Sequence, residues 1–164
     1  MRSFIAASGA IVAAAMLSLA SLPQDRGAEL RSRFEQETNP VQKAKLLPSL
    51  GEAEFELIRK DAEADRLPDA LALLRQYRDQ AESCAKGLDD TKVDAEKHPA
   101  GFKQLQISVQ ESLRRVDALL VNMTGDEQAP FRDVRNDLEE LNQHLIERLF
   151  PRRAPEAQKH ATSG

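Results

Sequence analysis

The sequence predicts an all-α protein, a small antiparallel helical bundle of about four helices that follows a signal peptide. Aromatic residues make up only 4% of the chain, with no Trp and one Tyr, so a core must rely on Leu, Ala, Val and a few Phe. β-Sandwiches depend more on β-branched and aromatic side chains. No long run alternates apolar and polar residues, which disfavours a large sheet. A chain of 164 residues fits one domain.

Residues 1–20 have the pattern of a secretory signal peptide. Arg2 supplies a positive end, residues 3–22 carry no charge, and the small residues Ser18 and Ala20 fit a cleavage site after Ala20. The uncharged stretch is also nearly long enough to span a bilayer, so an uncleaved anchor in the inner membrane is the alternative. We therefore expect a periplasmic or secreted protein with no stable membrane association after cleavage.

Residues 21–39 form a polar lead-in, in which Leu30 and Phe34 would support a short helix over 25–37. The helical domain is expected over 40–150. Proline is well tolerated at the first position of a helix, where its missing N–H has no intrahelical partner. Four prolines at similar intervals are therefore predicted to open the four helices: Pro40, Pro68, Pro99 and Pro130.

The first two predicted helices span 40–65 and 68–88 and are joined by a short turn at Asp65-Arg66-Leu67. Asn39 is a suitable N-cap for the first, with Gln42 as its capping-box partner. Pro48 lies inside this helix and is expected to kink or split it. Apolar residues recur at helical spacing in both: Val41, Ala44, Leu47, Leu50, Phe55, Ile58, Ala62, then Ala70, Leu71, Leu74, Tyr77, Ala81, Cys84, Leu88.

The polar stretch 87–98 is the predicted exposed loop before two further helices, over 100–123 and 130–150. Their apolar residues recur in steps of three and four, which predicts antiparallel pairing through a turn at Thr124-Gly125-Asp126. These two stripes are also the expected contact surface or dimer seam. The stripes are Phe102, Leu105, Val109, Leu113, Val116, Leu120 and Phe131, Val134, Leu138, Leu141, Leu145, Leu149. The tail 151–164 lacks a hydrophobic pattern and is expected to be disordered.

Two stretches carry resemblances to known proteins. LIRKDAEADRLPDALALL, residues 57–74, resembles the helix-turn-helix of a tetratricopeptide-type repeat without its turn glycine, and a single unit predicts a local helical hairpin. LLPSLGEAEFELIRKDAEADRLPDALALLRQYRD and GFKQLQISVQESLRRVDALL also resemble a group of uncharacterised exported bacterial all-helical proteins. That resemblance covers roughly residues 40–150, implies a bacterial envelope setting and implies no activity.

Charge and motifs narrow the possible functions. The net charge is −4 with acids and bases interleaved, a poor match for a nucleic-acid phosphate backbone. Cys84 is the only cysteine, so no intramolecular disulfide can form, and we expect it to be a small buried residue. The sequence contains neither a Gly-x-Ser-x-Gly nucleophile elbow nor a glycine-rich phosphate loop. No catalytic residue is predicted.

Glu140, His144 and Glu147 are the candidate metal ligands, because their spacing of i, i+4 and i+7 places them on one helical face. A carboxylate-bridged metal bundle requires Glu-x-x-His pairs on other helices, and neither that motif nor His-Glu-x-x-His occurs. A solvated face therefore explains these residues better than a metal site, and no metal or cofactor is predicted.

These observations favour an exported, non-enzymatic helical protein that acts through protein–protein interaction in the bacterial envelope. The expected partner is another protein or a second copy of the chain, with a homodimer as one form. The alternative is a ligand- or metal-binding helical bundle.

Overall fold

The computed structural model describes residues 23–151. The predicted signal peptide at 1–20 and the predicted tail beyond Pro151 lie outside the described residues. Within them the chain is all-helical, with no strand, which confirms the predicted fold class. The helices are α1 (Pro23–Gln36), α2 (Pro40–Glu63), α3 (Leu67–Asp90), α4 (Ala100–Leu120) and α5 (Gly125–Leu149).

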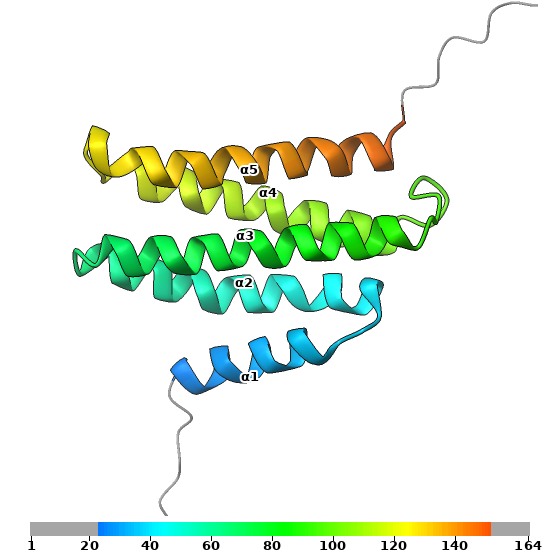
Figure 1. Cartoon of the computed structure of the whole chain (residues 1–164), viewed down its shortest axis with the longest axis horizontal. Helices are drawn as coiled ribbons and strands as arrows, with labels where there is room; N and C mark the ends of the chain where they lie inside the picture. The colour runs from blue at the N-terminus through cyan, green and yellow to red at the C-terminus, as the bar shows by residue number, and fades with distance from the viewer. Residues whose placement is uncertain (1–22, 152–164) are drawn as a thin grey trace, which may run out of the picture.

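Four of these helices form two antiparallel hairpins, α2–α3 and α4–α5, that lie side by side (Figure 1). Around the bundle, α2 neighbours α3 and α4, while α5 neighbours the same two helices from the opposite corner. Consequently α2 runs parallel to α4, and α3 runs parallel to α5. The loop 91–99 crosses the end of the bundle from one hairpin to the other, which explains its greater length.

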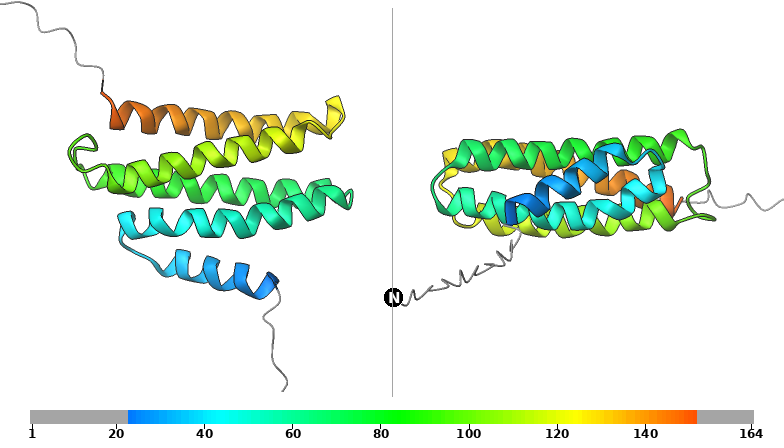
Figure 2. Two further views of the ribbon diagram at one scale, coloured as in Figure 1. Left: turned by 180° about the vertical axis from the view of Figure 1, so that it is seen from behind. Right: turned by 90° about the horizontal axis from the view of Figure 1, so that it is seen from below.

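Helix α1 confirms the short helix predicted in the lead-in, and it lies outside the four-helix bundle. It packs against α2 alone among the helices and crosses it obliquely (Figure 2). Phe34 is 3% exposed in this interface, and the Lys43 ammonium lies 4.8 Å from the centre of its ring. Leu30 packs against the same core while staying partly exposed.

Three of the four helices begin at or beside the proline that was predicted to open them. Pro40 opens α2, Pro68 lies in the first turn of α3, and Pro99 immediately precedes α4. Asn39 caps α2 as predicted, with its side chain accepting from the backbone N–H groups of Val41 and Gln42. The predicted capping-box role of Gln42 is wrong, because the Asn39 N–H donates to the Glu37 carboxylate at 2.8 Å.

The predicted start of the last helix at Pro130 is also wrong. Helix α5 begins at Gly125, and Pro130 lies inside it. Thr124 and Glu127 form a capping box in which the Glu127 carboxylate accepts from the Thr124 N–H at 2.8 Å. This cap fixes the helix start about one turn before the proline, and the turn lies at residues 121–124 instead of the predicted Thr124–Asp126.

Pro48 does not split α2, which continues from Pro40 to Glu63. Proline removes the hydrogen bond to the carbonyl of Ala44 and strains the helix. The residues around it compensate by packing, since Ala44, Leu47 and Leu50 are fully buried. Tertiary contact therefore overrides the local preference of the proline. None of the helices in the described part is both long and apolar enough to cross a lipid bilayer.

The apolar stripes predicted from the sequence form the core. Both α4 and α5 contribute five or more buried side chains, and Leu113 and Leu141 are only 6% and 9% exposed. Leu71 and Leu120, also predicted to face inward, are only partly buried. Because the α4 and α5 stripes are buried within one chain, they offer no open seam to a partner.

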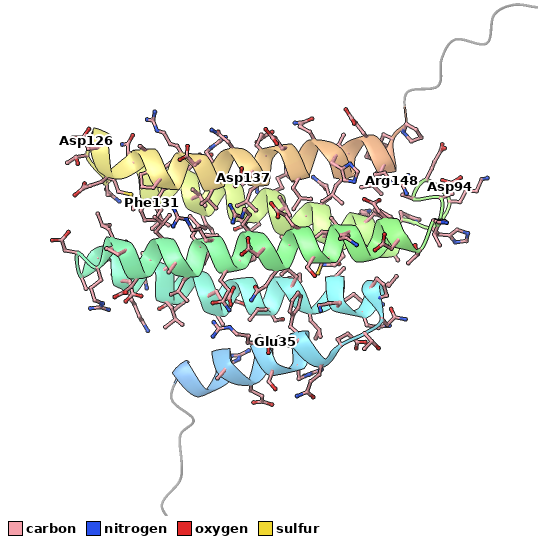
Figure 3. The ribbon with its side chains drawn as sticks, in the orientation of Figure 1. Glu35, Asp94, Asp126, Phe131, Asp137 and Arg148 are labelled. Carbon is pink, nitrogen blue, oxygen red and sulfur yellow. The ribbon has the colours of Figure 1, made fainter. Side chains whose placement is uncertain are left out.

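Ion pairs connect neighbouring helices at the surface of the bundle. Arg78 of α3 donates to Asp137 of α5 at 2.6 Å, and Asp137 is labelled in Figure 3 on the side of α5 that faces α3. Arg135 of α5 donates to Asp117 of α4 at 2.6 Å. These pairs are partly exposed, so each adds little to stability and mainly fixes the alignment of the helices.

Replacing Leu113 or Leu141 with Ala should lower the free energy of unfolding by about 2–5 kcal/mol, because each change removes apolar contacts and leaves a cavity. Thermal unfolding followed by circular dichroism measures this loss. Arg132→Ala and Asn136→Ala, on the exposed face of α5, are the controls and should stay within about 0.5 kcal/mol. If both leucine variants had the melting temperature of the wild-type chain, the buried core would be contradicted.

Candidate functional site

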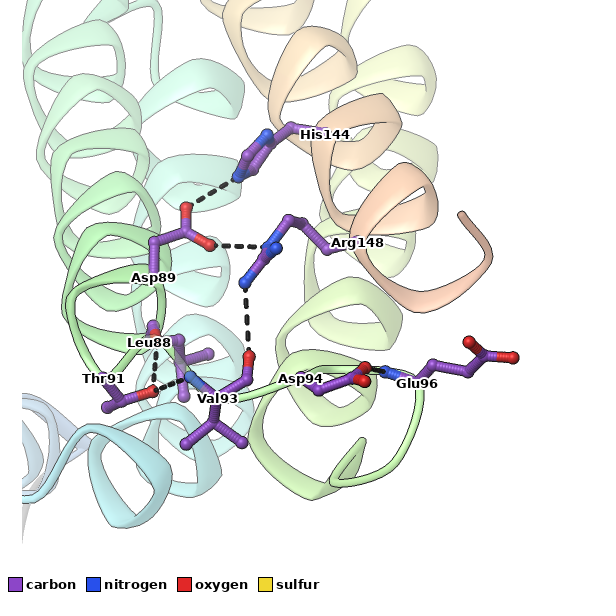
Figure 4. A network of polar contacts seen from close by, with 8 residues as sticks. All are labelled: Leu88, Asp89, Thr91, Val93, Asp94, Glu96, His144 and Arg148. Carbon is purple, nitrogen blue, oxygen red and sulfur yellow. Dashed lines mark hydrogen bonds and ion pairs between the residues drawn. The ribbon is translucent and has the colours of Figure 1, made fainter. Parts of the chain in front are cut away.

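The structure places the predicted metal candidates on the exposed side of α5. His144 Nε2 lies 2.7 Å from Asp89 Oδ2 of α3, so its polar partner comes from another helix rather than from Glu140 or Glu147 (Figure 4). Both glutamates are exposed. In residues 23–151 no group of three His, Cys, Asp or Glu side chains is placed to hold a metal ion. The three candidates are therefore not brought together as a site.

Asp89 is the centre of a polar cluster that joins α3, α5 and the loop 91–99. Its second oxygen accepts from Arg148 Nε at 2.9 Å, and Arg148 Nη2 also donates to the carbonyl of Val93 at 3.3 Å (Figure 4). The Arg148 guanidinium lies 5.4 Å from the centre of the Phe102 ring. The carboxylate thus aligns the His144 and Arg148 side chains along the α3–α5 seam. This arrangement accounts for His144 as part of a structural contact.

The lone cysteine, Cys84, is buried as predicted, with 1% of its surface exposed. Burial raises the pKa of its thiol to about 12. The reactive form of cysteine is the thiolate, so a thiol with this pKa stays protonated at neutral pH. The Cys84 side chain extends from α3 and packs in the hydrophobic core of the bundle.

A buried hydroxyl cluster, which the sequence analysis did not single out, links α3 to α4. Tyr77 Oη lies 2.6 Å from Ser112 Oγ and 3.2 Å from Ser108 Oγ. The Tyr77 ring passes so close to α2 that a Cβ at Gly51 would lie 2.8 Å from Cε2 of the ring. Burial raises the pKa of the phenol, which keeps Tyr77 neutral. The cluster satisfies its own hydrogen bonds in the core.

A surface groove is bounded by α1, α2 and α4 and is here called the α1–α2–α4 groove. It has a volume of about 1200 Å³. A second hollow of about 320 Å³ continues between α2 and α4 and shares Ser49, Glu52, Phe55 and Arg115 with the first. The groove is lined by Arg26, Glu29, Ser49, Glu52, Ala53, Phe55, Glu56, Leu57, Arg59, Ala62, Glu63, Asp65, Leu67, Arg115, Ala118, Leu119, Asn122, Met123 and Glu127.

Apolar and charged side chains alternate across this groove. Ala53, Leu57, Leu119 and Met123 are partly buried and supply its apolar surface. Phe55 lies beneath, with its ring centre 5.2 Å from that of Tyr77 and the Arg115 guanidinium 5.7 Å from its centre. No sequence pattern predicts the groove, because the α1 wall and the α2–α4 pairing are tertiary features.

Helix α1, which forms one wall, is anchored by a buried carboxylate. Glu54 of α2 is 0% exposed, and its Oε1 accepts from Arg31 of α1 at 3.0 Å and from Gln80 of α3 at 3.2 Å. Glu54 Oε2 and Gln80 Oε1 are buried without a hydrogen-bond partner. Desolvation outweighs these hydrogen bonds and the Arg31 charge and raises the pKa of Glu54. Helix α1 is therefore held by an ion pair whose buried carboxylate lacks a hydrogen-bond partner for one of its oxygens.

In comparisons with known proteins, no family model, no curated protein and no solved structure matches this chain. The resemblance to exported bacterial helical proteins stays a prediction from the sequence pattern. The site must therefore be interpreted from its own geometry and chemistry.

Replacing Arg31 with Ala should loosen α1, because it leaves the Glu54 carboxylate buried without a cation. Breaking such a pair costs up to about 3–5 kcal/mol, and α1 can limit that cost by leaving α2. We expect faster hydrogen exchange of the α1 amides at neutral pH. Since the folded pKa of Glu54 is raised, its protonation favours the docked state, so the effect should shrink as the pH falls through that pKa.

The Glu54→Gln variant is the matched control for this prediction. Its amide removes the buried charge and supplies a donor for the unsatisfied Gln80 oxygen. We expect α1 to stay protected in Glu54→Gln and the further change Arg31→Ala to have little effect in that background. Equal deprotection by Arg31→Ala in both backgrounds would show that the charge on Glu54 does not matter.

Proposed function

We propose that this chain is an exported, non-enzymatic protein of the bacterial envelope that binds another protein through the α1–α2–α4 groove. The single observation that carries this proposal is the groove itself, which combines partly buried apolar side chains with a charged rim. Protein interfaces share this anatomy of an apolar centre and a polar rim. The α4 and α5 stripes, which the sequence suggested as a contact surface, are occupied by the core.

The size of the groove favours a macromolecule over a small ligand. Small-molecule sites usually have volumes of roughly 300–1,000 Å³ and enclose most of the ligand. The α1–α2–α4 groove has about 1200 Å³ and continues into the neighbouring hollow. The groove lining has six carboxylates and three guanidiniums. This acidic balance disfavours anionic lipids and nucleic acids, whose binding depends on basic side chains.

Export is supported by the sequence of residues 1–20, with its positive end, uncharged stretch and small residues before the cleavage site. The intact mass of the protein from a bacterial envelope fraction should correspond to a chain that begins near Ser21. A chain that keeps Met1 and sediments with the membranes would favour the anchored alternative. Recovery of the full-length chain from the cytoplasm would contradict export.

Photo-crosslinking tests the binding function. A photoreactive side chain at Ala118, exposed on α4 in the groove, should form adducts with a specific protein in cells. The same side chain at Asn136, exposed on α5 and outside the groove, is the control and should form few. Absence of protein adducts at Ala118, or equal adducts at both positions, would contradict a partner-binding role for the groove.

A further inference from the structure

We infer that the partner segment held by the α1–α2–α4 groove is an amphipathic helix whose apolar stripe is flanked by Lys and Arg. This inference rests on the proposed binding function and specifies the chemistry of the partner. It follows from three properties of the groove: its helical walls, its apolar surface and the sign of its rim.

The walls of the groove have the shape that receives a helix. Helix α2 lines it from Ser49 to Glu63, which at 1.5 Å per residue gives a length of about 21 Å. Helices α1 and α4 rise on either side. Helices pack in such grooves at distances of about 8–10 Å between axes. A helical segment of about 15 residues would therefore fill the length of the groove.

The apolar side chains of the groove match one stripe of such a helix. Leu57 of α2, Leu119 of α4 and Met123 of the turn after α4 supply the larger contacts. Ala53 and Ala118 leave room for close approach. Met adapts well to differently shaped apolar partners. Helix-in-groove recognition uses apolar residues spaced at i, i+3, i+4 and i+7 on the bound segment.

The rim of the groove is acidic. Its lining contains six carboxylates and three guanidiniums, which leaves a formal charge of −3: Glu29, Glu52, Glu56, Glu63, Asp65 and Glu127 against Arg26, Arg59 and Arg115. Arg59 is paired with Glu56 and Glu63, and Arg115 with Glu111.

The acids that face an incoming partner are those without a cation of their own. Glu29, Glu52, Asp65 and Glu127 form no ion pair among the described side chains, and the Glu127 carboxylate is engaged by the Thr124 cap. Three carboxylates are left, and Arg26 is the lining guanidinium that likewise forms no ion pair with a described side chain. Three such carboxylates against one guanidinium favour basic residues on the partner, since complementary charge selects partners and speeds association.

The same charge argues against a second copy of the chain as the occupant. A two-fold dimer brings the same patch of both chains together, so two acidic grooves would face each other. Like charges across an interface oppose binding. The groove therefore fits a different, basic protein segment better than its own copy.

A displayed library of 18-residue helical peptides tests this inference with the mature chain as the target. The stripe positions vary among Ala, Leu, Met and Phe, and the flanking positions vary among Lys, Gln and Glu. Peptides enriched by the wild-type chain should carry Lys in the flanks. For a matched pair that differs only there, the Lys peptide should bind roughly tenfold more tightly than the Glu peptide at low salt.

Two triple variants, each lacking three negative charges, show whether the preference for Lys arises in the groove. Glu29→Gln, Glu52→Gln and Asp65→Asn together should abolish the preference for Lys, and Asn suits the left-handed backbone at residue 65. Glu35→Gln, Asp133→Asn and Glu140→Gln remove the same charge from exposed positions outside the groove and should preserve the preference. Ala118→Gln should weaken the binding of both peptides by narrowing the groove.

Several results would overturn the inference: no enrichment, enrichment of neutral or acidic flanks, or binding that the groove variants leave unchanged. Self-association of the wild-type chain in sedimentation, lost in Ala118→Gln, would identify a second copy as the occupant. If Ala118 crosslinks a protein in cells but the library selects acidic flanks, the binding function stands and the basic helix is wrong. If Lys peptides bind but Ala118 forms no protein adduct in cells, the proposed function fails instead.

Discussion

The arrangement of the helices depends on the contacts that the Tyr77 side chain makes with α2 and α4. This side chain extends from α3, passes α2 where Gly51 has no side chain, and reaches the serine hydroxyls of α4. A single aromatic residue therefore sets the spacing of three helices and joins the two hairpins. Its ring also supports Phe55, which lies beneath the α1–α2–α4 groove. The geometry of the surface groove is thus linked to a hydrogen-bonded cluster in the core.

The bundle and helix α1 are held by different kinds of interaction. Around the four-helix core, packing of Leu, Val, Ala and Phe dominates, and the ion pairs between helices lie at its surface. Helix α1 adds few buried side chains and relies on the contact between Arg31 and the buried Glu54. Buried ion pairs often contribute specificity rather than net stability. Glu54 fixes where α1 lies, and hence where one wall of the groove stands.

Sequence periodicity was sufficient for the all-helical class, for most of the buried residues and for the short helix over Leu30 and Phe34. It failed where a local rule competed with another interaction. Thr124 and Glu127 form a cap that overrides Pro130 as the helix start, although a Thr-x-x-Glu pattern was visible in the sequence. Pro48 stays in α2 because its neighbours are packed on several sides. Asp89 as the partner of His144, and the groove itself, depend on which helices become neighbours, and a one-dimensional pattern does not contain that information.

The diagonal loop 91–99 has a consequence for how the chain folds. Each hairpin closes over a short turn, at 64–66 or 121–124, so many contacts form between residues close in sequence. Loop closure over such distances carries a small entropic cost and proceeds quickly. The contacts between hairpins, by contrast, require the two units to meet in parallel register across the longer connection. The α2–α4 side of the groove is complete only when the two hairpins have docked, so we expect this surface to form late in folding.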